Sequence, residues 1–453
     1  MDVSFRHEID KARKHGDLYF AALLPEEVIN LAFGQARWLW RSWIYSPVVT
    51  IWVFLSQCLS QDHSCRDAVA SLINWRLAKG LPACSAETGA YCTARARIPE
   101  EVCRQLALWT GARADNDAPD DWRWHGHRVR CVDGSTITMP DTPANQAAYP
   151  QVSTQAPGCG FPIARIVVVF SLAVGTVLDA AIGNYEGKQT GENSLFRSLH
   201  GVLEKDDIVL EDRYFSGWFD IALLLQAGVH VVVRKHAGRS TDFRRGYRLG
   251  KDDQIVQWKK PAQPDWMTEE QYAALPNWLT LRETRVRVKQ KGFRTKVVIV
   301  ITSLLDAESY PADEIATLYR RRWDAELNLR SLKTVMQMDH LRCLAPDRVR
   351  NEFYMHLVAY NLIRRLMAIA AYERKEAPWT ISFKGTMQTL DRLLPLLPTT
   401  IDTDEWVDAI IRAVATHTVG NRPDRIEPRV KKRRPKNYPR MTKPRHEYKT
   451  AGA

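Results

Sequence analysis

The chain has 453 residues, of which 45% are hydrophobic and 26% charged, and 64 Lys and Arg against 52 Asp and Glu give a formal net charge of +12. These values are ordinary for a globular protein, exclude a disordered or collagen-like chain, and leave room for about two to four domains. The longest apolar run, residues 47–59, is shorter than the roughly 20 residues that span a bilayer, so we expect no membrane anchor. The first twenty residues lack the continuous apolar segment of a secretory signal, which favours a cytoplasmic protein.

The N-terminal quarter has a helical pattern. Residues 25–111 carry apolar side chains at helical spacing, and residues 64–78 do so most regularly. Ser85 is a candidate helix cap for the segment that ends near residue 106. This part is either a compact DNA-binding module or a simple helical bundle, and the pattern leaves both open. A polar stretch, residues 114–121, then reads as a linker.

Short runs of β-branched residues begin after this linker. The predicted strands cover residues 129–132, 163–174, 177–182, 207–210 and 229–234. Helical patterns at residues 194–203 and 218–227 separate some of them, so strands and helices alternate as in an α/β sheet.

Residues 236–300 interrupt this alternation and are predicted to form a β-rich insertion. Two alternating runs, residues 281–289 and 295–301, flank Gln290-Lys291-Gly292, a plausible hairpin turn. Long helices are then expected over residues 312–336 and 351–372.

The end of the chain is strongly basic. Residues 421–449 contain twelve Lys or Arg against three Asp or Glu, a net charge of +9. With many prolines and almost no aliphatic side chains, this tail cannot fold alone. It is either a solubilising tail or an arm that contacts a polyanion such as nucleic acid. The eight cysteines show no CxxC pair, so we expect free thiols and no zinc ribbon or disulfide framework.

Two acidic residues follow predicted strands. Asp133 comes directly after residues 129–132, and Asp212 comes directly after residues 208–211. Phosphoryl transfer on DNA uses two divalent cations about 3.5–4 Å apart, held by carboxylates that converge from separate elements. Each Asp alone is weak evidence for a metal site, because Asp-Gly and similar pairs are also common in turns.

A third carboxylate, Glu326, lies on the predicted helix 312–336. At 100° per residue one face of this helix, about 80° wide, also carries basic and phenolic side chains. These are Tyr319, Arg322, Arg330 and Lys333. Such a face suits a metal ligand beside a row of phosphates, but it could equally be an exposed face held by i,i+4 pairs such as Glu326–Arg330. Asp324 points about 160° away from Glu326 and is the poorer candidate.

Three sequence blocks together resemble the DDE-class transposases of bacterial insertion sequences, in the branch named after insertion sequence 4. The blocks are VDGSTITMPDTPANQAAYP at 132–150, VLEDRYFSGWFD at 209–220 and YRRRWDAELNLRSLK at 319–333. The last fits the branch's Y-(2)-R-(3)-E-(6)-K signature without a gap. The resemblance implies an α/β fold with an RNase H-like catalytic core and a metal-binding catalytic triad of Asp133, Asp212 and Glu326.

The resemblance also implies the partners of the site. Mg²⁺ is the expected cofactor, with Mn²⁺ as a substitute, and Tyr319, Arg322 and Lys333 are expected to contact DNA phosphates. Arg330 joins them from its place on the helix face. The expected activity is binding of terminal inverted repeats, cleavage of the ends and transfer of the 3′-OH strand into target DNA. A homodimer on double-stranded DNA, in the bacterial cytoplasm at the nucleoid, is expected.

The expected organisation places the catalytic core in two parts, residues 121–235 and 301–345, around the insertion at residues 236–300. An N-terminal helical domain (1–120) would bind DNA ends, and a C-terminal helical region (346–420) precedes the basic tail (421–453). Two alternatives remain: a related metal-dependent DNA nuclease, and a domesticated, non-catalytic DNA-binding protein. Some members of the branch place a Trp near the strand before the Glu-bearing helix to receive a flipped base. Residues 296–301 contain none, so a hairpin route stays open.

Overall fold

The computed structural model describes residues 24–36, 44–287, 297–393 and 403–420, with a few positions between 441 and 448. It is a mixed α/β protein that divides into two compact units. The first contains Met1–Arg123, Ala173–Asp179 and Leu327–Gly420, and the second contains Trp124–Leu172, Ala180–Glu326 and Asn421–Ala453. Among the helices of the described residues, none is both long and apolar enough to cross a membrane.

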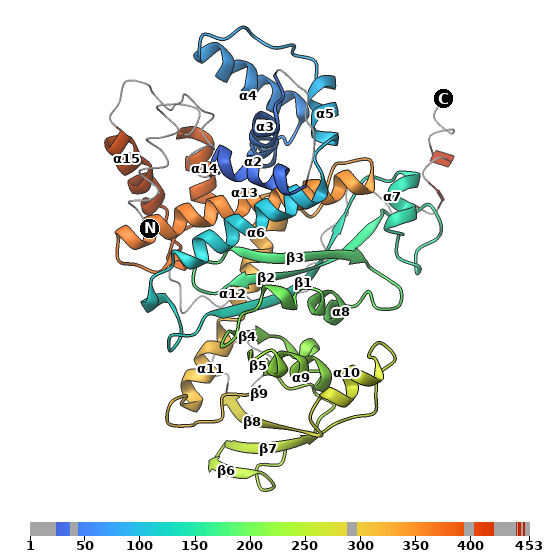
Figure 1. Ribbon diagram of the computed structural model, residues 1–453, viewed down its shortest axis with the longest axis vertical. Coiled ribbons are helices and arrows are strands. Elements are labelled where there is room, and N and C mark those ends of the chain that lie inside the picture. Colours follow the sequence, from blue (N-terminus) through green and yellow to red (C-terminus); the bar gives the residue numbers. More distant parts are fainter. Residues whose placement is uncertain are drawn as a thin grey trace. The chain divides into compact units, whose positions relative to one another are not determined.

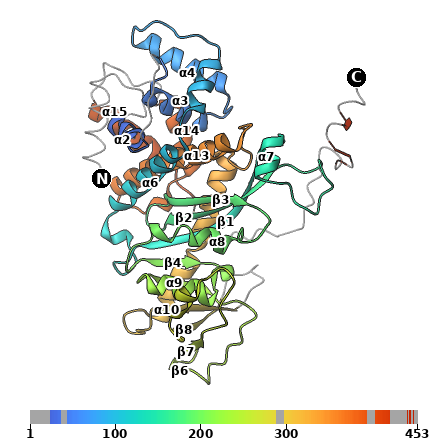
Figure 2. The ribbon, with the colours of Figure 1, turned by 45° about the vertical axis from the view of Figure 1, so that its right-hand side comes forward.

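The first unit is helical. Its longest helix, α13 (Pro346–Glu373), runs beside α6 (Glu100–Asn116) and also packs on α3 (Pro47–Leu59), as both views show (Figures 1 and 2). The remaining helices are α2 (Glu26–Gln35), α4 (Cys65–Ala78), α5 (Gly89–Ala96), α14 (Phe383–Leu393) and α15 (Thr403–Thr416). Every residue of α13 from 351 to 371 is buried, so this helix is the centre of the unit.

Local signals explain where these helices begin. Ser46 caps α3 by accepting a hydrogen bond from the Val49 backbone N–H, and Ser64 caps α4 in the same way through Asp67. The expected helical pattern over residues 25–111 is confirmed where the structure describes it. Two details differ: α5 begins after Thr88 rather than near Ser85, and α6 continues to Asn116 into the expected linker.

The chain forms a nine-stranded sheet of order β3-β2-β1-β4-β5-β9-β8-β7-β6, and all of it except the first residues of β3 belongs to the second unit. Strand β1 runs antiparallel to β2 and parallel to β4, which is in turn parallel to β5. The first strands are β1 (Val129–Thr138), β2 (Ile163–Ser171), β3 (Val177–Asn184), β4 (Ile208–Glu211) and β5 (His230–Arg234). Near these strands lie α8 (Glu192–Arg197), on β2, and α9 (Trp218–Gln226), on β5. The predicted strands and the helix at residues 218–227 are thus confirmed, whereas the helix predicted over residues 194–203 ends at Arg197 and is followed by a 3-10 turn (His200–Val202).

Strand β1 is longer than expected. The sequence places its end at residue 132, yet the strand continues through Asp133 and Gly134 to Thr138. Asp133 pairs with Val168 of β2, so the Asp-Gly pair belongs to a strand and not to a turn. The long antiparallel partner β2 explains the difference, because it supplies hydrogen-bond partners beyond residue 132.

The insertion extends the same sheet. It consists of β6 (Tyr247–Gly250), β7 (Asp253–Lys259), α10 (Glu269–Ala274) and β8 (Trp278–Arg287). Strand β9 (Val297–Thr302) joins it to the core by pairing antiparallel with β8 on one side and β5 on the other. The predicted pairing of the two alternating runs is therefore confirmed. The expected turn at residues 290–292 and most of the basic tail lie outside the described residues.

The expected helix over residues 312–336 is broken. Helix α11 (Ala312–Arg320) ends in a turn at Arg321 and Arg322, after which α12 (Trp323–Arg330) begins. In this turn the backbone N–H groups of Arg321 and Arg322 donate to carbonyls three residues back. A π-helical turn (Ser331–Val335) then follows α12. Apolar periodicity continues across such breaks, which is why the sequence pattern does not reveal them.

Candidate active site at the carboxyl ends of parallel strands

Asp133 and Asp212 lie level with each other on neighbouring parallel strands. Cys131 of β1 pairs with Leu210 of β4, and each Asp follows its strand's paired residue by two positions. Asp212 directly follows β4 and accepts a hydrogen bond from the Tyr214 backbone N–H at 2.6 Å, which fixes its carboxylate. The carboxyl ends of adjacent parallel strands are a common place for functional side chains in α/β proteins.

The Asp133 carboxyl has a perturbed pKa. This pKa is raised from 3.8 to about 6, chiefly by burial and to a smaller extent by the nearby carboxylates of Glu326 and Asp212. The Arg322 guanidinium and a hydrogen bond from the Gly134 N–H act in the opposite direction. The structure therefore brings the three predicted acidic residues into electrostatic contact, although they come from β1, the end of β4 and α12.

Glu326 is held by an arginine in the turn directly before its helix. Arg322 Nη2 lies 2.6 Å from Glu326 Oε1, and both side chains are partly buried. The i,i+4 pair of this segment is thus Arg322–Glu326, in place of the Glu326–Arg330 pair that the sequence allowed. Arg321, next in the chain to Arg322, points elsewhere and donates to Asp324 and to the Leu172 carbonyl.

Tyr319 is the predicted phenolic residue of this site. Burial raises the pKa of its hydroxyl to about 12, opposed by the nearby charges of Arg322 and Arg234. Arg234 ends β5, the next parallel strand after β4, and was missed by the sequence reasoning. A signal existed, because it follows a buried Val-rich strand just as Asp212 does.

A fourth carboxylate, Glu192, also lies beside the site. A Cβ added at Gly134 would come within 2.5 Å of the end of the Glu192 side chain, so a larger residue there would require Glu192 to move. Glu192 receives Arg165 Nη1 at 3.4 Å, and burial and Asp212 raise its pKa. Nothing in the local pattern of residues 185–192 marks this residue, because its position depends on how α8 packs on β2.

The two remaining predicted DNA contacts belong to the first unit. Arg330 is the exposed last residue of α12, and Lys333 lies in the π-helical turn, where burial lowers its pKa. The single straight face expected for Tyr319 through Lys333 is wrong in its geometry, because the helix is interrupted before α12 and again after it.

The donor set fits a hard divalent cation. Mg²⁺ prefers carboxylate oxygens, and the carboxylates of Glu326 and Asp212 add to the effect of burial, which is the main cause of the raised pKa of Asp133. In the part of the chain that the structure describes, no three His, Cys, Asp or Glu side chains already form a group that could hold a metal ion. The Arg322–Glu326 ion pair is consistent with this, since Glu326 faces a guanidinium.

The chain is similar to known transposases. A family model described as "Transposase DDE domain" matches residues 124–362. Transposase InsG for insertion sequence element IS4 of Escherichia coli (strain K12) is 28% identical over 368 residues, which are 78% of each chain. The transposase for insertion sequence element IS421 of Escherichia coli is 36% identical over 66 residues, 15% of this chain and 18% of that protein.

One solved structure also matches, at a low level of similarity. It is the cryo-EM structure of the piggyBac transposase synaptic complex with hairpin DNA, at a TM-score of 0.42 and 10% identity, covering 90% of this chain and 87% of that one. The family model shows the family, because it matches more than half of the chain. The protein belongs to the DDE transposase family, as the three sequence blocks predicted.

Proposed function

We propose that this chain is the transposase of a bacterial insertion sequence, which binds the terminal inverted repeats, cleaves the DNA ends and transfers the 3′-OH strand into target DNA. The observation that carries this is the grouping of Asp133, Asp212 and Glu326 beside Arg322, with the pKa of Asp133 raised to about 6. Family membership supports the DNA substrate. The sheet order β3-β2-β1-β4-β5 supports an RNase H-like core.

Asp133, Asp212 and Glu326 are proposed to hold Mg²⁺ or Mn²⁺. Such ions, when bound, supply activation of the attacking water or 3′-OH and stabilise the leaving oxygen. The chain's own cations position the substrate. The Arg322 guanidinium presents planar donors to a phosphate next to the carboxylates, and Arg234 and the Tyr319 hydroxyl extend this donor set. No Ser or His nucleophile is required by this arrangement.

Two ends must be joined, so we propose a homodimer on double-stranded DNA as the working complex, acting in the cytoplasm at the nucleoid. The first unit is the proposed end-binding part, together with the basic tail. Arg330 and Lys333 are proposed to contact DNA phosphates from α12 and the turn after it. Short inverted repeats and a target duplication flanking the reading frame would identify the substrate ends.

The test is a cleavage and strand-transfer assay on a duplex that carries the flanking inverted repeat. Asp133→Ala, Asp212→Ala and Glu326→Ala should each abolish Mg²⁺-dependent cleavage and leave end binding intact. Cleavage near the wild-type rate by one variant removes that residue from the triad. Hydrolysis without transfer of the 3′-OH strand would favour the nuclease alternative, and end binding without either reaction would favour the non-catalytic one.

A further inference from the structure

The insertion carries a second concentration of positive charge, apart from the tail. Residues 236–300 contain fourteen Lys or Arg against seven Asp or Glu. Four of the arginines form two pairs, and one aspartate holds each pair. These are Arg244 and Arg245 on Asp242, and Arg285 and Arg287 on Asp252. We call these four residues the arginine array.

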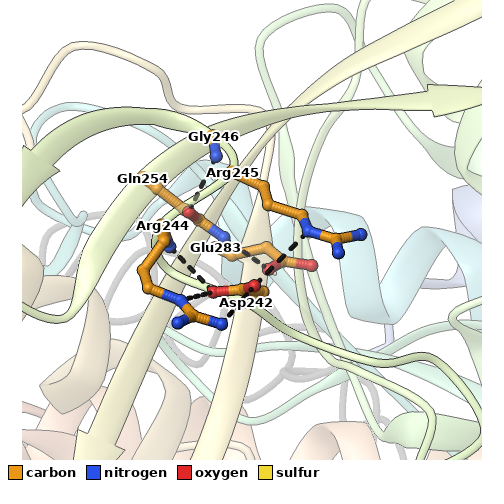
Figure 3. Close-up of polar contacts among 6 residues, drawn as sticks. All are labelled: Asp242, Arg244, Arg245, Gly246, Gln254 and Glu283. Atoms are coloured by element: carbon orange, nitrogen blue, oxygen red, sulfur yellow. Dashed lines mark hydrogen bonds and ion pairs between the residues drawn. The ribbon is translucent and has the colours of Figure 1, made fainter.

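Asp242 binds both arginines of the first pair, and its carboxylate lies between their side chains (Figure 3). It accepts the Arg244 backbone N–H at 3.0 Å and Arg244 Nε at 2.9 Å, while Arg245 Nε lies 3.4 Å from its other oxygen. Yet 89% of the Arg244 side chain and 87% of the Arg245 side chain remain exposed. The loop therefore presents two oriented guanidinium groups to solvent.

The loop that carries this pair is anchored from within. Lys235 donates to the Ser240 carbonyl, to Thr241 and to the buried Glu283. At the other end of the loop, Gln254 accepts the Gly246 backbone N–H at 3.2 Å and donates to Glu283 at 3.2 Å (Figure 3). A Cβ at Gly246 would approach the Ile255 carbonyl to 2.5 Å, so the close approach requires glycine. These buried hydrogen bonds hold the loop in one conformation, which a loop with no binding role would not require.

The second pair, Arg285 and Arg287, lies at the same end of the sheet as Asp212. Strand register links Glu211 to Val233, and the next residue, Arg234, to Val300 of β9. Val300 pairs in turn with Thr284, the neighbour of Arg285. Asp212 and Thr284 are thus three strand steps apart, about 14 Å at roughly 4.8 Å per step, well within one turn of a DNA duplex.

The second pair contacts the loop that carries the first pair. The Arg285 guanidinium lies 4.5 Å from the centre of the Phe243 ring, which belongs to the anchored loop. Arg285 and Arg287 also line a cavity of about 730 Å³ together with Lys251 and Arg320. Arg320 is the last residue of α11 and follows Tyr319 directly. Basic side chains therefore continue from the array toward the helix that carries part of the site.

We propose that the arginine array binds the phosphate backbone of duplex DNA outside the scissile position, and that Asp242 and Asp252 are positioning residues for it. The inference rests on the proposed function and deepens it. Phosphates are the ligands that oriented guanidinium groups bind best, and a backbone contact needs no base sequence. Asp242 binds some of the N–H groups of each arginine, and the remaining guanidinium N–H groups are the ones proposed to donate to DNA phosphates.

The test measures binding of the full chain to a random-sequence duplex of about 30 base pairs over a range of salt concentrations. Arg244→Gln with Arg245→Gln should lower the slope of log K against log salt by about 1.8, or 0.9 per phosphate contact. Arg285→Gln with Arg287→Gln should do the same. Lys205→Gln with Lys259→Gln removes two exposed charges of the same unit and should leave the slope nearly unchanged. Equal slopes of log K against log salt for all three double variants would overturn the proposal.

The variant Asp242→Ala distinguishes the positioning of Arg244 and Arg245 by Asp242 from the effect of net charge on DNA binding. It adds one net positive charge, which by itself tightens binding to DNA, whereas loss of positioning weakens it. We expect weaker binding and a lower slope than wild type. Glu270→Ala, an exposed residue of α10, makes the same charge change away from the array and should bind at least as tightly as wild type. Tighter binding by Asp242→Ala would overturn the positioning role. Normal cleavage with unchanged slopes would refute this inference alone, whereas cleavage by Asp133→Ala would refute the triad.

Discussion

The guanidinium of Arg322, in the turn before α12, lies 2.6 Å from the Glu326 carboxylate, while the neighbouring Arg321 binds Asp324 and the Leu172 carbonyl. Two consecutive residues of identical chemistry thus have different partners. Arg322 pairs with one of the proposed catalytic carboxylates, and Arg321 pairs with Asp324, which is not one of them. This pair offers an internal control for every role proposed for this helix.

Arg322→Ala should lower the cleavage rate by about 100-fold or more, because it removes the cation beside Glu326 and Asp133. Arg321→Ala should change cleavage by no more than about threefold and act mainly on stability. The measurement is cleavage of a pre-nicked end at fixed Mg²⁺ and salt. Equal damage from both substitutions would contradict the assignment of Arg322 to the site.

Asp133→Asn should stabilise the metal-free protein at pH 7.5 even though it removes cleavage. The folded-state pKa of about 6 exceeds the ordinary 3.8, so the folded protein holds this proton more tightly than the unfolded chain does. Stability therefore falls as the pH rises from about 4 to about 6, and ionised Asp133 is unfavourable above that range. A neutral amide removes this cost, worth about 1–3 kcal/mol.

The measurement is thermal unfolding of both proteins in a chelator, repeated with excess Mg²⁺. Added Mg²⁺ should raise the melting temperature of the wild type more than that of Asp133→Asn, because a ligand stabilises the form that binds it. A wild type that exceeds the variant in chelator would show that Asp133 is not electrostatically strained.

Gly134→Ala should destabilise the protein by about 1–3 kcal/mol and impair cleavage. The new Cβ would overlap the Glu192 side chain, which must then move beside Asp133. Combining it with Glu192→Ala removes the overlapping atoms and should restore most of the stability. The measurement is a double-mutant cycle by chemical denaturation. Additive losses would place the strain of Gly134→Ala somewhere other than at Glu192.

Glu283→Ala should destabilise the second unit by about 3–5 kcal/mol, because it leaves the buried Lys235 ammonium without its carboxylate. Replacing both partners, with Lys235→Met and Glu283→Leu, should recover much of this loss. Denaturant unfolding measures the difference. The double variant also loses the internal support of the loop, so its DNA-binding slope should fall even where its stability recovers.

The sequence sufficed for the order of elements and for residues that follow short apolar strands. Asp212 and the strands on either side of it could be predicted because burial on both faces produces a continuous apolar run. Asp133 shows the limit of that approach, since the strand continues past it through pairing with β2. Glu192 and Arg165 could not be found, because their position depends on the packing of α8 on β2 and no local pattern encodes that contact. Arg234 could have been predicted in the same way as Asp212, because it also lies at the end of a short apolar strand.

The turn at Arg321 and Arg322 also changes how this region tolerates variation. In one continuous helix, a residue inserted into α11 would rotate Glu326 by about 100° and carry it away from Asp133. A turn between two short helices can change its backbone conformation to accommodate the inserted residue without rotating α12. The orientation of Glu326 then depends on α12 and its own Arg322, so the segment before the turn can vary in length and packing while the carboxylate stays in register with the sheet.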